Sequence, residues 1–156
     1  MTASATGTRL DLAAWIALLR AHSRVVRELS AELVAEHGLT INDYEVLLWL
    51  SREEDRRMRP VDLASRVLLS PSGITRLLAG LERAGHVCRT ACPTDARVSY
   101  AELTDEGLAK LRDASKTHLD GVERLFLSRF DERERATLAE LLGRLDGEAE
   151  PDCSRG

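Results

Sequence analysis

The stretch from Ser70 to Leu103 constrains the fold more than any other part of the sequence, because its hydrophobic period changes once. Ser70-Pro71 joins a residue typical of helix N-caps to a proline suited to the first helical turn. The apolar residues that follow are spaced i, i+3, i+4 and i+7: Ile74, Leu77, Leu78 and Leu81. Beyond Gly85 the period becomes 2, which predicts strands at 87–90 and 98–103 joined by a turn that contains Pro and Asp. The stretch therefore predicts an amphipathic helix followed by a β-hairpin.

Helices are also predicted on the N-terminal side of this stretch. An apolar stripe over 10–36 predicts a first helix, which ends before a glycine. Thr40, followed three residues later by Asp43, approximates a capping box for a second helix. The charged segment 52–59 is predicted to be a loop, and Pro60 suits the first turn of a short third helix.

Two more helices are predicted after the hairpin. Thr104 caps a long helix that extends to Phe130, and Asp131 with Glu134 forms a second box-like cap before a last helix. A helix of about 27 residues would span roughly 40 Å, which is more than a small domain needs. We therefore expect the long terminal helices to form a dimer interface.

The order of these elements predicts a mainly α fold: a winged helix-turn-helix with a two-stranded β wing and long N- and C-terminal dimerisation helices. We expect a single domain over 1–156. Its parts would be N-terminal helices for dimerisation and the core (10–55), a DNA-binding lobe (56–103), C-terminal dimerisation helices (104–146) and a disordered tail (147–156).

The charge distribution favours a local site for a polyanion. The chain has a formal net charge of −4, yet residues 56–103 hold eight Arg against four Asp or Glu, a local +4. A solvated charged face is the alternative interpretation. No apolar run reaches the roughly 18 residues that span a bilayer, and the N-terminal residues lack a signal-peptide core. We expect a cytoplasmic protein with no membrane contact.

Several segments resemble the MarR family of winged helix-turn-helix regulators. Residues 60–66 resemble the first helix of that family's helix-turn-helix, 70–78 resemble its recognition helix, and 81–85 resemble the helix end before the wing. The resemblance covers about residues 10–145, and it is nearest to a branch common in actinobacteria.

The wing also resembles the family pattern, which is Asp-Arg-Arg, then Leu-Thr and a Gly three residues further on. The matching residues are Asp95, Arg97, Leu103-Thr104 and Gly107. The chain departs from the family at two positions. Ala96 occupies the middle wing position, and Leu68 stands where many members carry Gly in the turn.

The recognition helix supplies the first set of predicted DNA contacts. Side chains near the N-terminus of such a helix reach base edges in the major groove. The face left free by the apolar stripe carries Ser72, Thr75 and Arg76, next to the predicted cap Ser70. Arg76 is the candidate for a bidentate contact to guanine or phosphate. Gly73, which is unfavourable inside a helix, would let the backbone approach DNA closely.

The wing supplies the second set. Arg97 is expected to enter the minor groove, where narrow A/T tracts attract guanidinium groups. The resemblance implies that Asp95 orients this arginine or braces the hairpin, and a simple turn Asp is the alternative.

Trp15, Glu45 and Arg89 resemble the ligand-binding set of urate-responsive family members, in which a Trp, an acidic residue and an Arg hold a planar anion. The acidic residue in those relatives is typically Asp, so Glu45 is a departure. The resemblance implies a small aromatic or anionic effector. A role of Trp15 in the core or dimer interface is the alternative.

The cysteines suggest a further alternative. Cys92 could be an exposed reactive thiol, which would make the protein a thiol-based redox-sensing regulator, and Cys88 and Cys153 are weaker candidates. His86, Cys88 and Cys92 follow a His-x-Cys-x3-Cys spacing, but no fourth ligand is obvious, so we expect no metal.

The sequence therefore predicts a homodimeric, sequence-specific regulator that binds a pseudo-palindromic operator in double-stranded DNA. Repression relieved by an effector is the expected mode, with no cofactor. The sequence contains no Gly-rich phosphate loop, HExxH motif or paired nucleophile, so we expect no enzyme. A winged-helix module that binds proteins without binding DNA is the alternative from another class.

Overall fold

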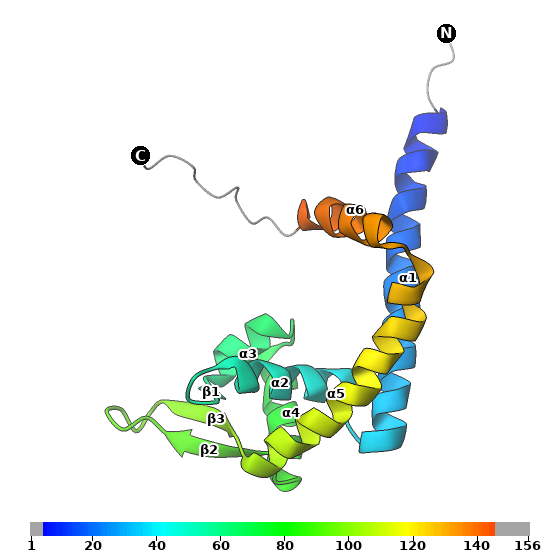
Figure 1. Ribbon diagram of the computed structural model, residues 1–156. Coiled ribbons are helices and arrows are strands. Elements are labelled where there is room, and N and C mark those ends of the chain that lie inside the picture. Colours follow the sequence, from blue (N-terminus) through cyan, green and yellow to red (C-terminus); the bar gives the residue numbers. More distant parts are fainter. Residues whose placement is uncertain (1–4, 146–156) are drawn as a thin grey trace, which may run out of the picture. The chain divides into compact units, whose positions relative to one another are not determined.

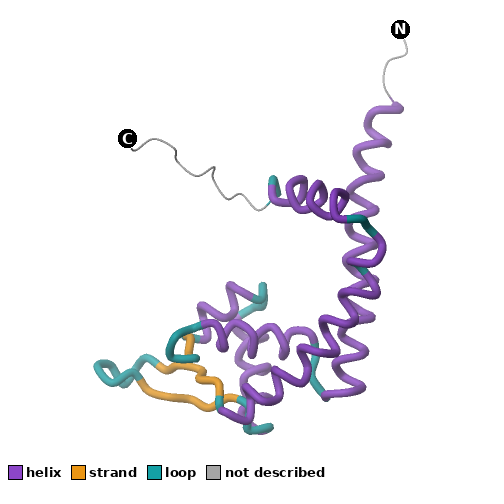
Figure 2. Tube along the Cα trace, in the orientation of Figure 1, coloured by secondary structure: helices purple, strands orange, loops and turns teal. Residues whose placement is uncertain are grey.

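The computed structural model describes residues 5–145, with side chains from residue 12 onward. The tail expected at 147–156, together with Cys153, lies outside the described residues. The elements follow in the order α1 (Ala5–His37), α2 (Ile41–Arg52), β1 (Arg57–Met58), α3 (Pro60–Arg66), α4 (Pro71–Arg83), β2 (Val87–Ala91), β3 (Ser99–Leu103), α5 (Asp105–Leu125), the 3₁₀ helix η1 (Leu127–Arg129) and α6 (Glu132–Gly143) (Figure 1). Helices predominate along the chain (Figure 2), which confirms the mainly α winged helix-turn-helix.

Local capping explains where two of the helices begin. Thr40 Oγ1 accepts a hydrogen bond from the backbone N–H of Asp43 at 3.2 Å, and Asp43 Oδ2 accepts one from the Thr40 N–H at 2.8 Å. Asp131 and Glu134 form the same reciprocal pair before α6, at 2.8 and 2.9 Å. Each box satisfies N–H groups that a helix start otherwise leaves unpaired. Both predicted capping boxes are therefore confirmed.

The wing belongs to a three-stranded antiparallel sheet with strand order β1-β3-β2. In this sheet Met58 and Arg89 both pair with Ala101, on opposite sides of β3. The two-stranded wing expected from the sequence is thus incomplete, and the loop predicted at 52–59 contains β1. Arg56 enters β1 with a φ of 52°, and its carbonyl oxygen accepts a hydrogen bond from the Leu103 N–H at 2.9 Å.

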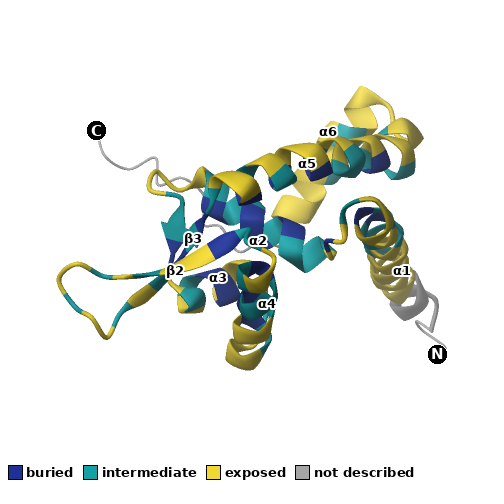
Figure 3. Ribbon diagram, turned by 90° about the horizontal axis from the view of Figure 1, so that it is seen from below, coloured by how far each residue is buried: buried dark blue, intermediate teal, exposed yellow. Residues whose placement is uncertain are grey.

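The hydrophobic core lies in the compact unit that ends at Leu119. Its most buried side chains come from α1 to α4: Leu33, Val46, Leu47, Leu50, Leu63, Ile74 and Leu78. Figure 3 shows buried residues where α2, α3, α4 and the sheet meet, and exposed residues along the wing loop and at one end of α4. This packing leaves one face of α4 and the wing loop free.

A second compact unit begins at Asp120. The long helix predicted to reach Phe130 ends earlier, at Leu125, because Phe126 leaves helical geometry with φ −126° and ψ −64°. The rings of Phe126 and Phe130 lie 5.3 Å apart on either side of η1, and the Arg135 guanidinium donates a hydrogen bond to the Leu127 carbonyl at 3.3 Å. Among the helices that the structure describes, none combines the length and apolarity needed to cross a membrane.

Candidate DNA-binding site

α4 begins at a side-chain cap that the sequence predicts. Ser70 Oγ accepts a hydrogen bond from the Gly73 N–H at 3.1 Å, and Pro71 occupies the first turn, where no N–H is needed. Ile74, Leu78 and Leu81 are buried on the core side of α4. The amphipathic pattern therefore fixes which face of α4 is turned away from the core.

Ser72, Thr75 and Arg76 are exposed on α4. The Ser72 and Ser70 hydroxyls lie 3.2 Å apart, and the Thr75 hydroxyl donates to the Pro71 carbonyl at 2.8 Å. Arg76 forms no hydrogen bond or ion pair with another described residue. Its guanidinium group is therefore available to a partner outside the chain.

Contacts within the chain explain why position 73 is a glycine. A β-carbon at this position would lie 3.2 Å from Ser70 Oγ, the atom that caps α4, and 3.7 Å from the Leu69 β-carbon. A larger residue would therefore disturb the cap. Close approach of the backbone to DNA, which the sequence suggested, is not needed to explain the glycine.

The wing loop holds an arginine at its surface. The Arg97 side chain is 93% exposed, and Asp95 Oδ1 accepts hydrogen bonds from its backbone N–H at 3.0 Å and from its Nε at 3.3 Å. The loop is closed by hydrogen bonds from the Cys92 N–H to the Val98 carbonyl at 2.8 Å and from the Val98 N–H to the Asp95 carbonyl at 3.0 Å. Asp95 thus both shapes the turn and restrains Arg97, while the outer nitrogens of the guanidinium are free.

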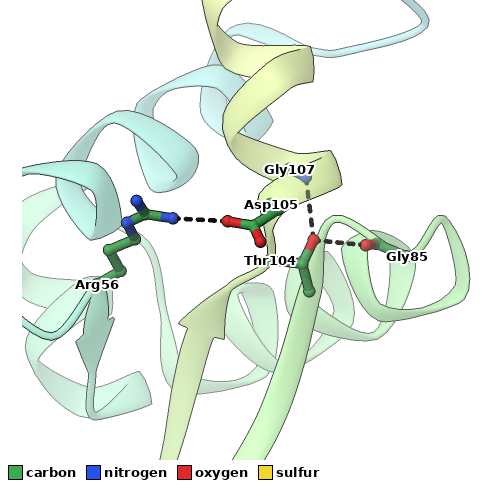
Figure 4. A network of polar contacts seen from close by, with 5 residues as sticks. All are labelled: Arg56, Gly85, Thr104, Asp105 and Gly107. Atoms are coloured by element: carbon green, nitrogen blue, oxygen red, sulfur yellow. Dashed lines mark hydrogen bonds and ion pairs between the residues drawn. The ribbon is translucent and has the colours of Figure 1, made fainter.

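A network at the base of the wing joins three elements (Figure 4). The Thr104 hydroxyl donates to the Gly85 carbonyl at 2.7 Å and accepts from the Gly107 N–H at 3.0 Å. The Arg56 guanidinium forms an ion pair with Asp105 at 3.0 Å. The Leu-Thr and Gly positions of the wing pattern are therefore structural, since they attach the start of α5 to the end of α4.

A cationic cluster that the sequence analysis missed lies at the ends of α2 and α3. The guanidinium carbons of Arg52 and Arg66 lie 5.1 and 4.8 Å from the centroid of the Trp49 ring. The i, i+3 spacing of Trp49 and Arg52 on one helix is a signal for the first contact. The Arg66 contact depends on how α3 packs against α2, and local sequence does not predict it.

The predicted effector residues lie on three separate elements. Trp15 is 56% exposed on α1, Glu45 is half-buried on α2, and Arg89 on β2 forms an ion pair with Glu82 at 2.6 Å. Burial raises the pKa of the Glu45 carboxyl. No hydrogen bond or ion pair joins the three side chains in the described part of the chain. Their joint role as a ligand site stays a prediction.

Cys92 lies at the start of the wing loop, with its Sγ 3.2 Å from Thr94 Oγ1. Hydrogen bonding by the Thr94 side chain, and then by the Thr94 and Asp95 backbone, lowers the pKa of the Cys92 thiol. His86, Cys88 and Cys92 form no metal-binding group, and no other set of three His, Cys, Asp or Glu does so within the described residues.

These features define the class of winged helix-turn-helix DNA-binding proteins. A MarR family model matches residues 37–98. The regulator MhqR of Bacillus subtilis is 28% identical over 138 residues, which are 88% of this chain and 92% of that protein. Among solved structures, AbsC of Streptomyces coelicolor, a MarR family transcriptional regulator, is 32% identical with a TM-score of 0.82, over 93% of this chain and 96% of that one.

A second structure from the same organism, Sco3205 in complex with DNA, is 26% identical with a TM-score of 0.83, over 100% of this chain and 96% of that one. The chain accordingly belongs to the MarR family of transcriptional regulators. The family resemblance noted in the sequence is thereby confirmed.

Proposed function

We propose that the protein is a homodimeric repressor that binds a pseudo-palindromic operator in duplex DNA. One observation carries the proposal: the exposed face of α4 and the wing loop each present an arginine, Arg76 and Arg97, that is available to an external anion. An α-helix fits the major groove, and an arginine on a wing suits the adjacent minor groove.

Each predicted contact residue then has a defined role. Ser70 and Ser72, at the start of α4, supply hydroxyl groups for base edges or phosphates. The Thr75 hydroxyl donates to the Pro71 carbonyl, so its oxygen is left to accept from a base edge. Arg76 reads a base or grips a phosphate with its planar guanidinium. In the wing, Asp95 restrains Arg97 by accepting a hydrogen bond from its Nε.

Exposed apolar side chains support the dimer. On α1 they are spaced i, i+3, i+4 and i+7: Leu12, Trp15, Ile16 and Leu19. Further along the same helix an open groove of about 810 Å³ is lined in part by Val26, Val34 and Ile41. On α6, Leu141 and Leu142 are exposed as well. Large apolar surfaces of this kind mark interfaces, and most soluble homo-oligomers are two-fold dimers.

The proposed division of labour follows from these surfaces. Residues 10–55 serve dimerisation and the core, 104–146 are the C-terminal dimerisation helices, and 56–103 form the DNA-binding lobe. Regulation by a small aromatic or anionic ligand is part of the proposal, supported by the half-buried Glu45 carboxyl, whose charged form has no partner in the described chain. The protein acts in the cytoplasm and catalyses no reaction. A protein-binding winged helix is the rival function.

Two measurements test the proposal. Light scattering should give about twice the chain mass of 17.3 kDa, and a particle of the single-chain mass would contradict the dimer. Selection from a random duplex pool by the purified protein should yield paired half-sites about 10 bp apart, because two-fold symmetry places two recognition helices in successive major grooves. Failure to retain any duplex at low salt would favour the protein-binding module.

A further inference from the structure

Leu68, in the turn between α3 and α4, combines two unfavourable features. Its φ is 55°, in the left-handed region, and its side chain is 90% exposed. No other large apolar side chain in the described residues is as exposed. Left-handed backbone is strained for a residue with a β-carbon, and glycine adopts it freely. Leucine at this position gains no burial in return.

The neighbouring residues hold the turn in this conformation. The Val67 N–H donates to the Leu63 carbonyl at 3.0 Å, and the Leu69 N–H donates to the Ala64 carbonyl at 2.9 Å. Val67 is buried, and Leu69 packs against the core. Because both flanking residues are fixed, residue 68 must adopt the left-handed conformation whatever its side chain is. Stability therefore does not explain a leucine here, and strain that surrounding structure maintains is typical of functional positions.

Leu68 lies two residues before the α4 cap, Ser70, and so at the end of α4 that carries the predicted base contacts. The exposed side chains that this end of α4 offers for base contacts, Ser70, Ser72 and Arg76, are polar. The major groove presents one apolar group on its base edges, the C5-methyl group of thymine. An exposed, fixed leucine at this end of α4 matches that group in chemistry.

We infer that Leu68 contacts a thymine methyl group in each half-site and contributes to sequence specificity. The inference rests on the proposed DNA-binding function, and it assigns a reading role to a residue outside the recognition helix. Ser70, Ser72 and Arg76 recognise hydrogen-bonding groups on base edges. Leu68 recognises a thymine at a further base pair, through its methyl group and without a hydrogen bond.

The test removes one partner of the contact at a time: the thymine methyl group from the DNA, or the Leu68 side chain from the protein. The purified homodimer is titrated against the duplex it selects, and each thymine is replaced in turn by uracil, which keeps base pairing and lacks the methyl group. One substitution per half-site should weaken wild-type binding about fourfold, as expected for one buried methyl group. For the Leu68→Gly variant, replacing the same thymine by uracil should not change the affinity. For Leu68→Met, the replacement should still cause most of the loss seen with the wild type.

The melting temperature distinguishes a lost contact from a damaged turn. Leu68→Gly should melt at or above the wild-type temperature, because glycine removes the backbone strain. Weaker binding by a protein that is no less stable supports the contact. A lower melting temperature together with weaker binding would overturn the inference, because the loss would then follow from the turn.

The remaining outcomes separate the inference from the function on which it rests. If the wild type selects a duplex and Leu68→Gly binds it equally well, or remains sensitive to uracil, the contact is wrong and the proposed function stands. If the wild type selects no duplex, the proposed function fails and the inference fails with it.

Discussion

A β-carbon on Gly107 would overlap the backbone carbonyl oxygen of His86. The same carbonyl oxygen accepts a hydrogen bond from the Thr104 N–H at 3.1 Å, so the first turn of α5 lies directly against the chain that leaves α4. The carbonyl belongs to the backbone and cannot move aside as the end of a flexible side chain could. Position 107 therefore has no room for any side chain.

Gly107→Ala should destabilise the fold by about 3 kcal/mol or more, at the upper end of the range for overpacked cores. The reason is that either α5 or the segment at His86 must move. Chemical denaturation followed by circular dichroism measures the change. Gly80→Ala is the matched control, because its β-carbon would meet only an Arg83 side-chain nitrogen at 4.0 Å. That variant should be neutral or more stable by up to about 1 kcal/mol. If the Gly107→Ala and Gly80→Ala variants are equally stable, the close contact between Gly107 and the His86 carbonyl is contradicted.

Arg76→Ala should weaken binding to the selected operator. If Arg76 reads a base, we expect a loss of about 1–3 kcal/mol on the operator, a much smaller loss on scrambled duplex, and relaxed preference at one position per half-site. The fold should be unaffected because the side chain is exposed and forms no hydrogen bond or ion pair with the residues that the structure describes. Fluorescence anisotropy with both duplexes measures the difference. If the Arg76→Ala variant binds the operator with wild-type affinity, Arg76 does not contact the DNA.

Arg97→Ala should act on affinity more than on sequence preference. The wing arginine responds to the width and potential of the minor groove, so the loss should appear on many duplexes with A/T-rich flanks. The slope of log affinity against log salt concentration should become shallower by roughly 1 per charge removed from each half-site. Titrations at several salt concentrations check this. An unchanged slope would mean that Arg97 makes no contact with the DNA.

Cys92 should react as a thiolate at lower pH than an ordinary cysteine, because hydrogen bonds from Thr94 and Asp95 lower the pKa of its thiol. We measure the rate of alkylation by iodoacetamide in a Cys88→Ser, Cys153→Ser background. The rate should rise with pH and reach its plateau at a lower pH than that of an ordinary cysteine. Thr94→Val removes the largest contribution and should shift this rise to higher pH. Identical pH profiles for the two proteins would show that Thr94 does not affect the thiol.

Sequence reasoning predicted the features that local chemistry determines. The caps at Thr40, Ser70 and Asp131 each join two residues three positions apart. Because such a cap needs no contact with a distant segment, the local sequence is enough to predict it. The buried face of α4 follows from its apolar spacing in the same way. The hairpin was predicted because the hydrophobic period changes and a turn containing Pro and Asp lies between its strands.

The features that sequence reasoning missed depend on contacts between distant segments. β1 has two residues, too few to show any period, and it exists because Arg57 and Met58 pair with Glu102 and Ala101. The last turn of α5 after Gly121 has no Gly or Pro, and the apolar pattern continues to Phe130, so no local signal marks the break at Phe126. The strain at Leu68 depends likewise on how α3 and α4 pack, although the family's Gly at this position was a clue.

The Thr104 bridge limits where the dimer can adapt to DNA. One hydroxyl is hydrogen-bonded to both the exit from α4 and the first turn of α5, so rotation of the recognition helix relative to the root of α5 would break at least one of these two hydrogen bonds. In the proposed dimer, a change in the distance between the two recognition helices that keeps both hydrogen bonds would have to originate away from this junction.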